Sequence, residues 1–178
     1  MKFVGGGCAL LAILSLSACG QEADDIRLQQ MSCPMVAVPD YSRDLVQWQG
    51  EGHDLTNLAY HVRIADAAGK CTRKPDNDNL YATFTVSLDA TRGPALAGRD
   101  IAVNYFVAVM RGPDIIDKQI YPMAATFAPN TDTLSITGKP ISMTLPLSTS
   151  VSGSDYTIEI GMQLTQAQID DNQSAARR

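Results

Sequence analysis

The sequence predicts an all-β fold: an antiparallel β-sandwich of about seven strands with one disulfide and a short C-terminal helix. Three observations lead to this prediction. Apolar and polar residues alternate at a period of two, turn-forming residues separate the alternating segments, and two of the four cysteines are available to pair. Alternation places successive side chains on opposite faces of a strand, so each segment has one buried and one solvated face.

Two segments carry the clearest alternation. The apolar positions of the first are Leu80, Ala82, Phe84, Val86 and Leu88, and those of the second are Tyr156, Ile158, Ile160, Met162 and Leu164. The further strand candidates are residues 34–38, 55–65, 101–110, 115–127 and 134–147, the last broken near 138–140. Residues 101–110 are apolar on both faces, which is typical of a central strand. Gly, Pro, Asn and Asp between these segments supply the turns.

A short helix is expected after the last strand. Thr165 and Gln168 have the spacing of a capping box, in which each side chain accepts a hydrogen bond from the backbone N–H of the other residue. We therefore expect the sandwich domain to occupy residues 33–166 and a helical or frayed tail to occupy residues 167–178.

The first eighteen residues have the features of a signal peptide. Lys2 supplies a positive charge, and the apolar run 9–16 is shorter than the roughly 20 residues that a transmembrane helix requires. Residues 16–19 read LSAC, which resembles the lipobox of bacterial lipoproteins. The resemblance implies cleavage after residue 18, lipidation of Cys19 and stable membrane anchoring by its acyl chains. An ordinary signal peptide that is cut elsewhere is the alternative.

The residues after the lipobox predict where the domain is held. Gly20, rather than an aspartate, follows Cys19, which by the sorting rule of enteric lipoproteins implies the periplasmic face of the outer membrane. Residues 19–32 are mostly polar and are expected to form the lipidated N-terminus and a flexible tether, with a span of roughly 20 Å.

The cysteine count predicts one disulfide. Cys8 leaves with the signal peptide and Cys19 is taken by lipid, so Cys33 and Cys71 remain for the exported domain. Two thiols in an oxidising compartment indicate a disulfide. By closing the loop between them, it would add on the order of 4 kcal/mol to the free energy of unfolding. The alternative, a metal-binding pair or a reactive thiol, lacks CxxC spacing and a nearby histidine.

Charge argues against a nucleic-acid partner. The whole chain has 14 basic and 19 acidic residues and a formal charge of −5; loss of Lys2 with the signal peptide makes this −6. Nucleic-acid binding requires a basic surface that replaces the counterions of phosphates. We find no cofactor signature, and an apolar content of 45% is typical of one globular domain.

Residues 141–160 resemble the loop-and-strand passage of immunoglobulin-like and fibronectin type III domains. In those families a tyrosine early in such a strand hydrogen-bonds back to the preceding loop, and Tyr156 has this position. The Cys33 and Cys71 pair lacks immunoglobulin spacing around Trp48, so the resemblance implies the architecture and not the family. Residues 19–178 also resemble small uncharacterised alphaproteobacterial lipoproteins, for which no activity follows.

The sequence contains three groups of candidate functional residues. Trp48 and Tyr41 are candidates for an exposed aromatic recognition surface, with core packing or a lid under the disulfide loop as the alternative. His53 and His61 are the only histidines that could serve as a hydrolase base, but no GxSxG motif is present. Both are expected at the surface, His53 in the loop 50–54 and His61 on the outward face of its strand. Residues 76–79, DNDN, could hold a hard cation, but they lack the glycine and glutamate of an EF-hand loop and are expected to form a polar turn.

Three functions are compatible with these residues. The first is a non-enzymatic, lipid-anchored interaction or assembly module that binds an envelope protein, as an accessory subunit of a larger complex. The second is a capture protein for a sugar, a peptide or a metal, which would use the loop 48–54 or the loop 76–79. The third is an envelope hydrolase that depends on His53 or His61. We expect the first, with no catalytic residue, no cofactor and no bound metal.

Overall fold

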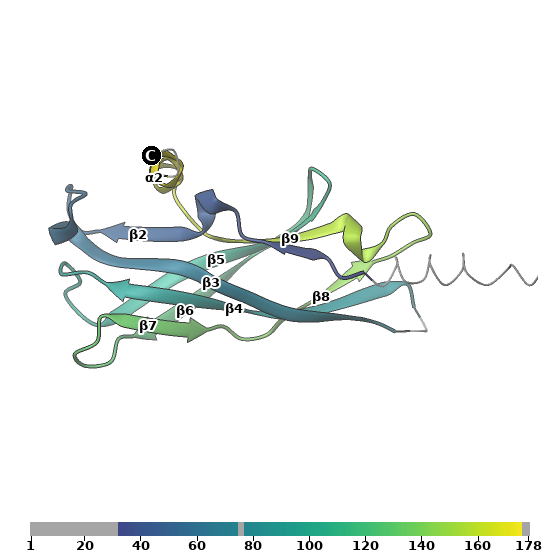
Figure 1. The fold of residues 1–178 in the computed structure, drawn as a ribbon, viewed down its shortest axis with the longest axis horizontal. Helices are drawn as coiled ribbons and strands as arrows, with labels where there is room; N and C mark the ends of the chain where they lie inside the picture. The colour runs from purple at the N-terminus through teal and green to yellow at the C-terminus, as the bar shows by residue number, and fades with distance from the viewer. Residues whose placement is uncertain (1–31, 75–76, 176–178) are drawn as a thin grey trace, which may run out of the picture.

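The computed structural model describes residues 32–74 and 77–175, whose strands form two facing sheets in a sandwich-like arrangement (Figure 1). The predictions for the signal peptide 1–18, for Cys19, for the tether up to residue 31, for Asp76 and for the chain end 176–178 lie outside the described residues.

The described chain is mostly β, with one disulfide and a short C-terminal helix, as predicted. In chain order its elements are β1 (Met35–Ala37), η1 (Asp40–Ser42), β2 (Asp44–Trp48), η2 (Leu55–Asn57), β3 (Leu58–Arg73), β4 (Asn79–Arg92), β5 (Asp100–Arg111), β6 (Asp114–Thr126), β7 (Thr133–Thr137), β8 (Ile141–Pro146), η3 (Gly153–Asp155), β9 (Tyr156–Met162) and α2 (Gln166–Ala175). Nine strands replace the expected seven or so. β2 is an additional strand that the sequence pattern did not predict, and the expected break at 138–140 divides one candidate into β7 and β8.

One sheet has the strand order β1-β9-β5-β6. The other has β2, β3 and β4 in order, and β7 and β8 both pair with the remaining side of the long β4. β1 pairs with β9 in parallel, so the prediction of a fully antiparallel sandwich is wrong for this pair. β1 and β9 lie far apart in sequence, and no hairpin therefore fixes their relative direction.

The core lies between the sheets and contains the alternating residues of the sequence pattern. All five predicted inward residues of β4 are buried, and so are those of β9 up to Met162. β5 is a central strand between β6 and β9, as its apolar faces predict. Phe127, directly after β6, is fully buried in the main core cluster.

The disulfide between Cys33 and Cys71 is confirmed, with the two Cα atoms 5.7 Å apart. It joins the residues just before β1 to the far part of β3, and so links the two sheets. The loop between β2 and β3 lies at the opposite end of the sandwich (Figure 1). Leu58 and Cys71 are separated by thirteen residues of strand, or about 43 Å.

Two local predictions near the C-terminus are also confirmed. The hydroxyl of Tyr156 donates to the main-chain oxygen of Pro146 at 2.6 Å, which ties β9 to the end of β8. Thr165 and Gln168 form the reciprocal capping box, with the Thr165 N–H donating to the Gln168 side chain at 2.9 Å and the Gln168 N–H donating to the Thr165 hydroxyl at 3.4 Å. Within residues 32–74 and 77–175, no helix is long and apolar enough to cross a membrane.

Candidate binding site between the β2–β3 loop and helix α2

The β2–β3 loop brings Trp48 and His53 together. Their rings are stacked, with centroids 5.4 Å apart and planes only 9° from parallel. The loop is closed by a hydrogen bond from the Gln49 N–H to the Asn57 carbonyl at 2.8 Å, and the Asp54 carboxylate caps η2 by accepting from the Thr56 N–H at 2.8 Å. These bonds fix the loop that carries His53, so the aromatic pair is part of the folded structure.

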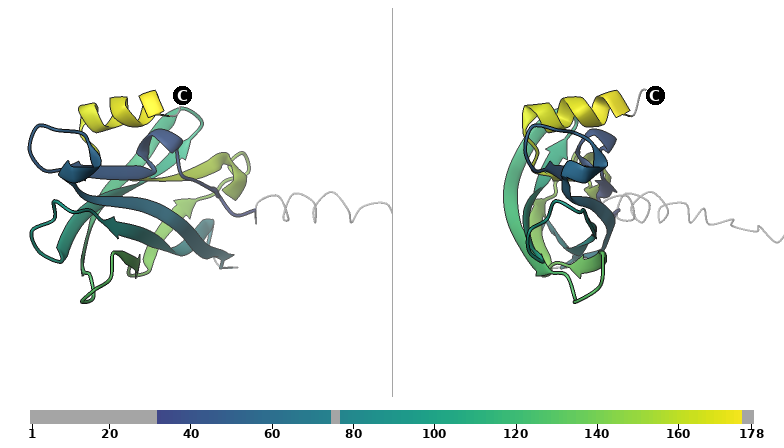
Figure 2. Two further views of the ribbon diagram at one scale, coloured as in Figure 1. Left: turned by 60° about the vertical axis from the view of Figure 1, so that its left-hand side comes forward. Right: turned by 90° about the vertical axis from the view of Figure 1, so that its left-hand side faces the viewer.

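Helix α2 lies across β2, an edge strand of the five-stranded sheet (Figures 1 and 2). Three side-chain hydrogen bonds hold it to main-chain oxygens. Gln168 donates to Val46 at 3.3 Å, and Asn172 donates to Asp44 at 2.8 Å and to Tyr41 at 3.1 Å. The Gln168 and Asn172 amides bond to the carbonyls of Val46 and Asp44 and so cover part of the free edge of β2.

A hollow of about 280 Å³ lies between this helix and the β2–β3 loop. It is lined by Val46, Trp48, His53, Gln168, Asp171, Asn172 and Ser174, and we call it the α2 pocket. The pocket combines an aromatic wall from one end of β2 with a polar wall from the C-terminal helix. The sequence predicted the loop 48–54, which carries Trp48 and His53, as a candidate ligand-binding loop, but nothing in it indicated that α2 would complete the site.

Tyr41 does not line the α2 pocket. Its side chain is 42% exposed on η1, and its carbonyl accepts one of the Asn172 hydrogen bonds. Of the two aromatic recognition candidates, the structure therefore places Trp48 in a pocket and gives Tyr41 a main-chain role in holding α2.

His61 lies on the outward side of β3 beside Arg63, as predicted, and forms a charged cluster with Asp44. The His61 Nε2 and Arg63 Nε atoms are 2.8 Å and 3.2 Å from the Asp44 carboxylate. Partial burial of Asp44 opposes its ionisation, but the hydrogen bond from His61 and the positive charge of Arg63 outweigh this and lower the pKa of Asp44 below its usual value. His61 and His53 thus have different partners: His61 pairs with a carboxylate, and His53 stacks on Trp48.

The described part of the 76–79 segment has internal partners. Asn77 accepts a hydrogen bond from the Asn79 N–H at 3.2 Å, and Asp78 forms an ion pair with Arg73 at 2.9 Å. Among residues 32–74 and 77–175, no group of three or more His, Cys, Asp or Glu side chains is placed to hold a metal ion.

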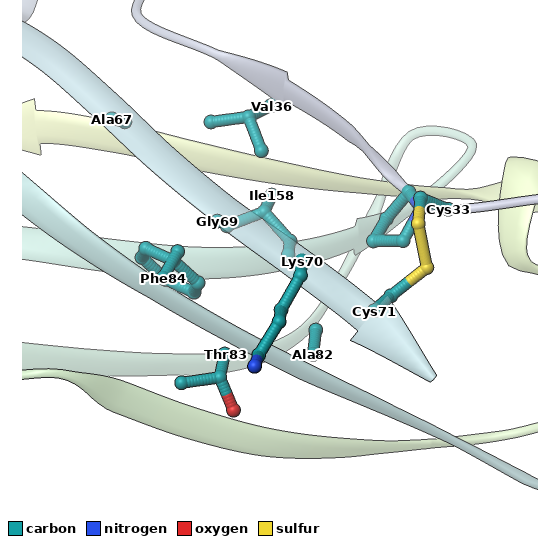
Figure 3. A pocket seen from close by; sticks show the side chains of 11 residues that line it. Cys33, Val36, Ala67, Gly69, Lys70, Cys71, Ala82, Thr83, Phe84 and Ile158 are labelled. Atoms are coloured by element: carbon teal, nitrogen blue, oxygen red, sulfur yellow. A yellow bond between two sulfur atoms is a disulfide. The ribbon is translucent and has the colours of Figure 1, made fainter. Parts of the chain in front are cut away.

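A second hollow, of about 180 Å³, lies beside the disulfide (Figure 3). It opens between β1 and the far half of β3, with Val36, Phe84 and Ile158 among its apolar lining and Lys70 at its side. The small residue Gly69 also lines it, and an added Cβ there would collide with Phe84. The hollow therefore exists because residue 69 has no side chain, and the alternation of apolar and polar residues in the sequence does not reveal this.

A third and larger hollow, of about 600 Å³, lies between β6 and the connection from β7 to β8. Tyr105 and Tyr121 stack beside it with ring centroids 5.5 Å apart. Burial raises the pKa of both phenols. Lys139 also lines this hollow.

Apolar side chains also collect on the outer face of the four-stranded sheet. The register aligns Met35, Thr157, Met110 and Ile115 in one row across β1, β9, β5 and β6, and it aligns Phe106 with Ile120 in another. Cross-strand partners share a face of the sheet. Met35, Ile115 and Ile120 are 63%, 62% and 54% exposed. We call Met35, Phe106, Met110, Ile115 and Ile120 the outer apolar face.

Comparison of the chain with protein-family models, with curated proteins and with solved structures finds no match. The fold and the surfaces described above define the class: a disulfide-linked, two-sheet β domain with a helix-covered pocket at one end and an exposed apolar sheet face.

Proposed function

We propose that this protein is a lipid-anchored envelope protein of bacteria that acts as a non-enzymatic interaction or assembly module, as an accessory subunit of an envelope complex. The observation that carries the proposal is the outer apolar face. Exposed apolar residues are normal when they are scattered singly, but several on one sheet face favour a surface that binds a partner. The two apolar rows of this face lie on either side of the row Glu159, Ala108 and Lys118, and the Lys118 ammonium lies over the Phe106 ring, so the surface combines apolar and charged contacts. We further propose an immunoglobulin-like topology, which the Tyr156 hydrogen bond to Pro146 supports.

The position of the outer apolar face agrees with anchoring through Cys19. Met35, in its first row, is two residues from Cys33, and Cys33 is fourteen residues after Cys19. A partner that covers this face would therefore bind close to the membrane, at the end of the sandwich from which the tether leaves. Complete burial of a fully exposed isoleucine side chain is worth about 1.5–3 kcal/mol. Ile115 and Ile120 are 62% and 54% exposed, so a partner that covers them gains roughly half of this value from each.

Site-specific photocrosslinking in cells tests the interaction. A photoreactive amino acid in place of Ile115 or Ile120 is expected to capture one reproducible envelope protein. The matched control is Leu55, which is 76% exposed on η2 near the other end of the sandwich. Equal capture from position 55, or no capture from position 115 or 120, would contradict the proposed docking surface.

The anchor has its own test. The intact mass of protein purified from membranes is expected to show removal of residues 1–18 and an acylated Cys19, and a Cys19→Ala variant is expected to leave the membrane fraction. An unlipidated chain cut at another residue would show that the protein is exported by an ordinary signal peptide.

The second candidate function is capture of a small ligand, and the α2 pocket is the specific observation that favours it. A ligand at 100 times its dissociation constant adds about 2.7 kcal/mol to the free energy of unfolding. A thermal-shift panel of sugars, peptides and metal ions is therefore expected to reveal a stabilising class of compound. Stabilisation that survives a Trp48→Ala substitution would assign the binding to another site.

A further inference from the structure

We propose that the α2 pocket binds an organic cation that carries N–H donors: an ammonium or guanidinium group. This inference does not depend on the membrane anchor or on the outer apolar face. It rests on three properties of the pocket, namely which polar atoms remain available, what the aromatic wall attracts, and how large a group the pocket admits.

Three of the four amide N–H donors of the polar wall are used by the fold. Asn172 donates from its amide nitrogen to the carbonyls of Asp44 and Tyr41, and Gln168 donates to the carbonyl of Val46. Each of these amide nitrogens has two hydrogens, so both donors of Asn172 are committed. Its remaining polar atom is an oxygen, which can only accept.

The charge of the lining has the same consequence. Asp171 contributes a carboxylate to the pocket, and among residues 32–74 and 77–175 no lysine or arginine lines it. The Asp171 carboxylate and the free amide oxygen of Asn172 accept hydrogen bonds, so a ligand that donates them and carries a positive charge is favoured. A hydrogen bond between a cation and a carboxylate is about twice as strong as a neutral one. The formal charge of −5 on the whole chain also attracts cations to its surface.

The aromatic wall favours the same kind of ligand. Tryptophan is the side chain whose ring face attracts cations most strongly, and guanidinium groups also stack on it. His53 holds the Trp48 ring in place through their parallel stacking, so the indole is oriented before a ligand arrives. At about 280 Å³ the pocket lies at the small end of ligand sites, which run from about 300 to 1,000 Å³, and it suits one charged head group rather than an oligosaccharide.

The natural source of the cation is either a free amine or the side chain of an arginine or lysine in a peptide. Both present the same chemistry to Trp48 and Asp171. Agmatine represents the free amine, and N-acetyl-arginine amide represents the peptide side chain. N-acetyl-citrulline amide has nearly the shape of the arginine compound but no charge, and tetramethylammonium has the charge but no N–H donor.

Trp48 is the only tryptophan of the chain, so its fluorescence reports on the pocket without a label. We would titrate purified full-length protein in nonionic detergent with the four compounds and repeat each titration by calorimetry. Agmatine or N-acetyl-arginine amide is expected to saturate the protein with a dissociation constant at or below about 5 mM, and the citrulline compound and tetramethylammonium are expected to bind at least about tenfold more weakly. The tighter of the two binding compounds identifies the source of the cation.

Two matched variants locate the site. Asp171→Asn is expected to weaken binding by about tenfold or more, whereas Asp170→Asn, which removes the same charge one residue away on the helix, is expected to change it less than about twofold. Asp170 is bonded to Gln166 on the helix surface, and it does not line the pocket. Equal weakening by both variants, equal binding of the citrulline and arginine compounds, or no binding signal by fluorescence and calorimetry would each overturn the proposal. Far-UV circular dichroism checks that both variants keep their helix.

Discussion

Loss of the Asn172 side chain is expected to release helix α2 while the sandwich stays folded. Asn172→Ala removes two hydrogen bonds, to the Asp44 carbonyl at 2.8 Å and to the Tyr41 carbonyl at 3.1 Å. The Gln168 bond to Val46, at 3.3 Å, is the remaining one of the three side-chain bonds that hold the helix to β2 and η1. Because these bonds join the helix to the sheet edge and do not enter the core, their loss acts on helix docking first.

The magnitude follows from the number of bonds. At about 1 kcal/mol for each hydrogen bond, the substitution costs about 2 kcal/mol of docking free energy. Alanine favours the helix over asparagine by about 0.6 kcal/mol, which offsets part of the loss. The net effect of about 1.4 kcal/mol corresponds to a tenfold rise in the equilibrium constant for undocking.

Native-state hydrogen exchange measures this opening. The protection factors of amides in the second half of α2 are expected to fall about tenfold. Those of β4, which lies inside its sheet, should not change. Ser174→Ala is the matched control, because it changes a side chain on the same helix and removes none of the three docking bonds. Unchanged protection in α2, or an equal loss in α2 and β4, would refute the account of how the helix is held.

Three further predictions concern the sandwich itself. Replacing Cys33 and Cys71 together by alanine is expected to lower the free energy of unfolding by about 4 kcal/mol. In a calorimetric scan the midpoint of thermal unfolding should then fall by about 8–16 °C, and an unchanged midpoint would contradict the loop-closure account. Tyr156→Phe keeps the buried ring and removes its hydrogen bond, so urea denaturation is expected to show a loss of about 1 kcal/mol, whereas equal stability would mean that the bond contributes nothing net. Asp44 has a lowered pKa in the folded state, so its contribution to stability is fully present above its unfolded pKa of about 3.9 and is lost as the pH falls through the folded value. Urea midpoints between pH 7 and pH 2 are expected to converge for the wild type and Asp44→Asn at the acid end, and a constant difference across that range would assign the effect to packing.

Local sequence patterns predicted the parts of the fold that depend on neighbouring residues. A period of two predicted which side chains of β4 and β9 are buried, because a strand alternates its faces regardless of its partners. The capping box at Thr165 and Gln168 was predictable because both halves of the interaction lie within one helical turn. The disulfide between Cys33 and Cys71 followed from counting the cysteines expected to stay in the exported domain.

The candidate site was predictable only in fragments. The loop 48–54, which carries Trp48 and His53, was one of two candidate ligand-binding loops by sequence. Asp171, which supplies the charge of the α2 pocket, gave no signal, because a polar residue on a solvated helix is unremarkable by sequence pattern. It acquires a role only because the helix is placed across β2.

The sequence by itself therefore determined an all-β chain with a cysteine pair, an alternating core and a terminal helix, because local propensity and side-chain period set these features. Only the tertiary structure decided that β1 joins β9 in parallel, that α2 covers the edge of β2, and that Trp48 lies in one pocket with Asp171. These three contacts join segments more than a hundred residues apart. Their geometry depends on how two twisted sheets pack and which edges remain open, and no local pattern along the chain encodes that outcome.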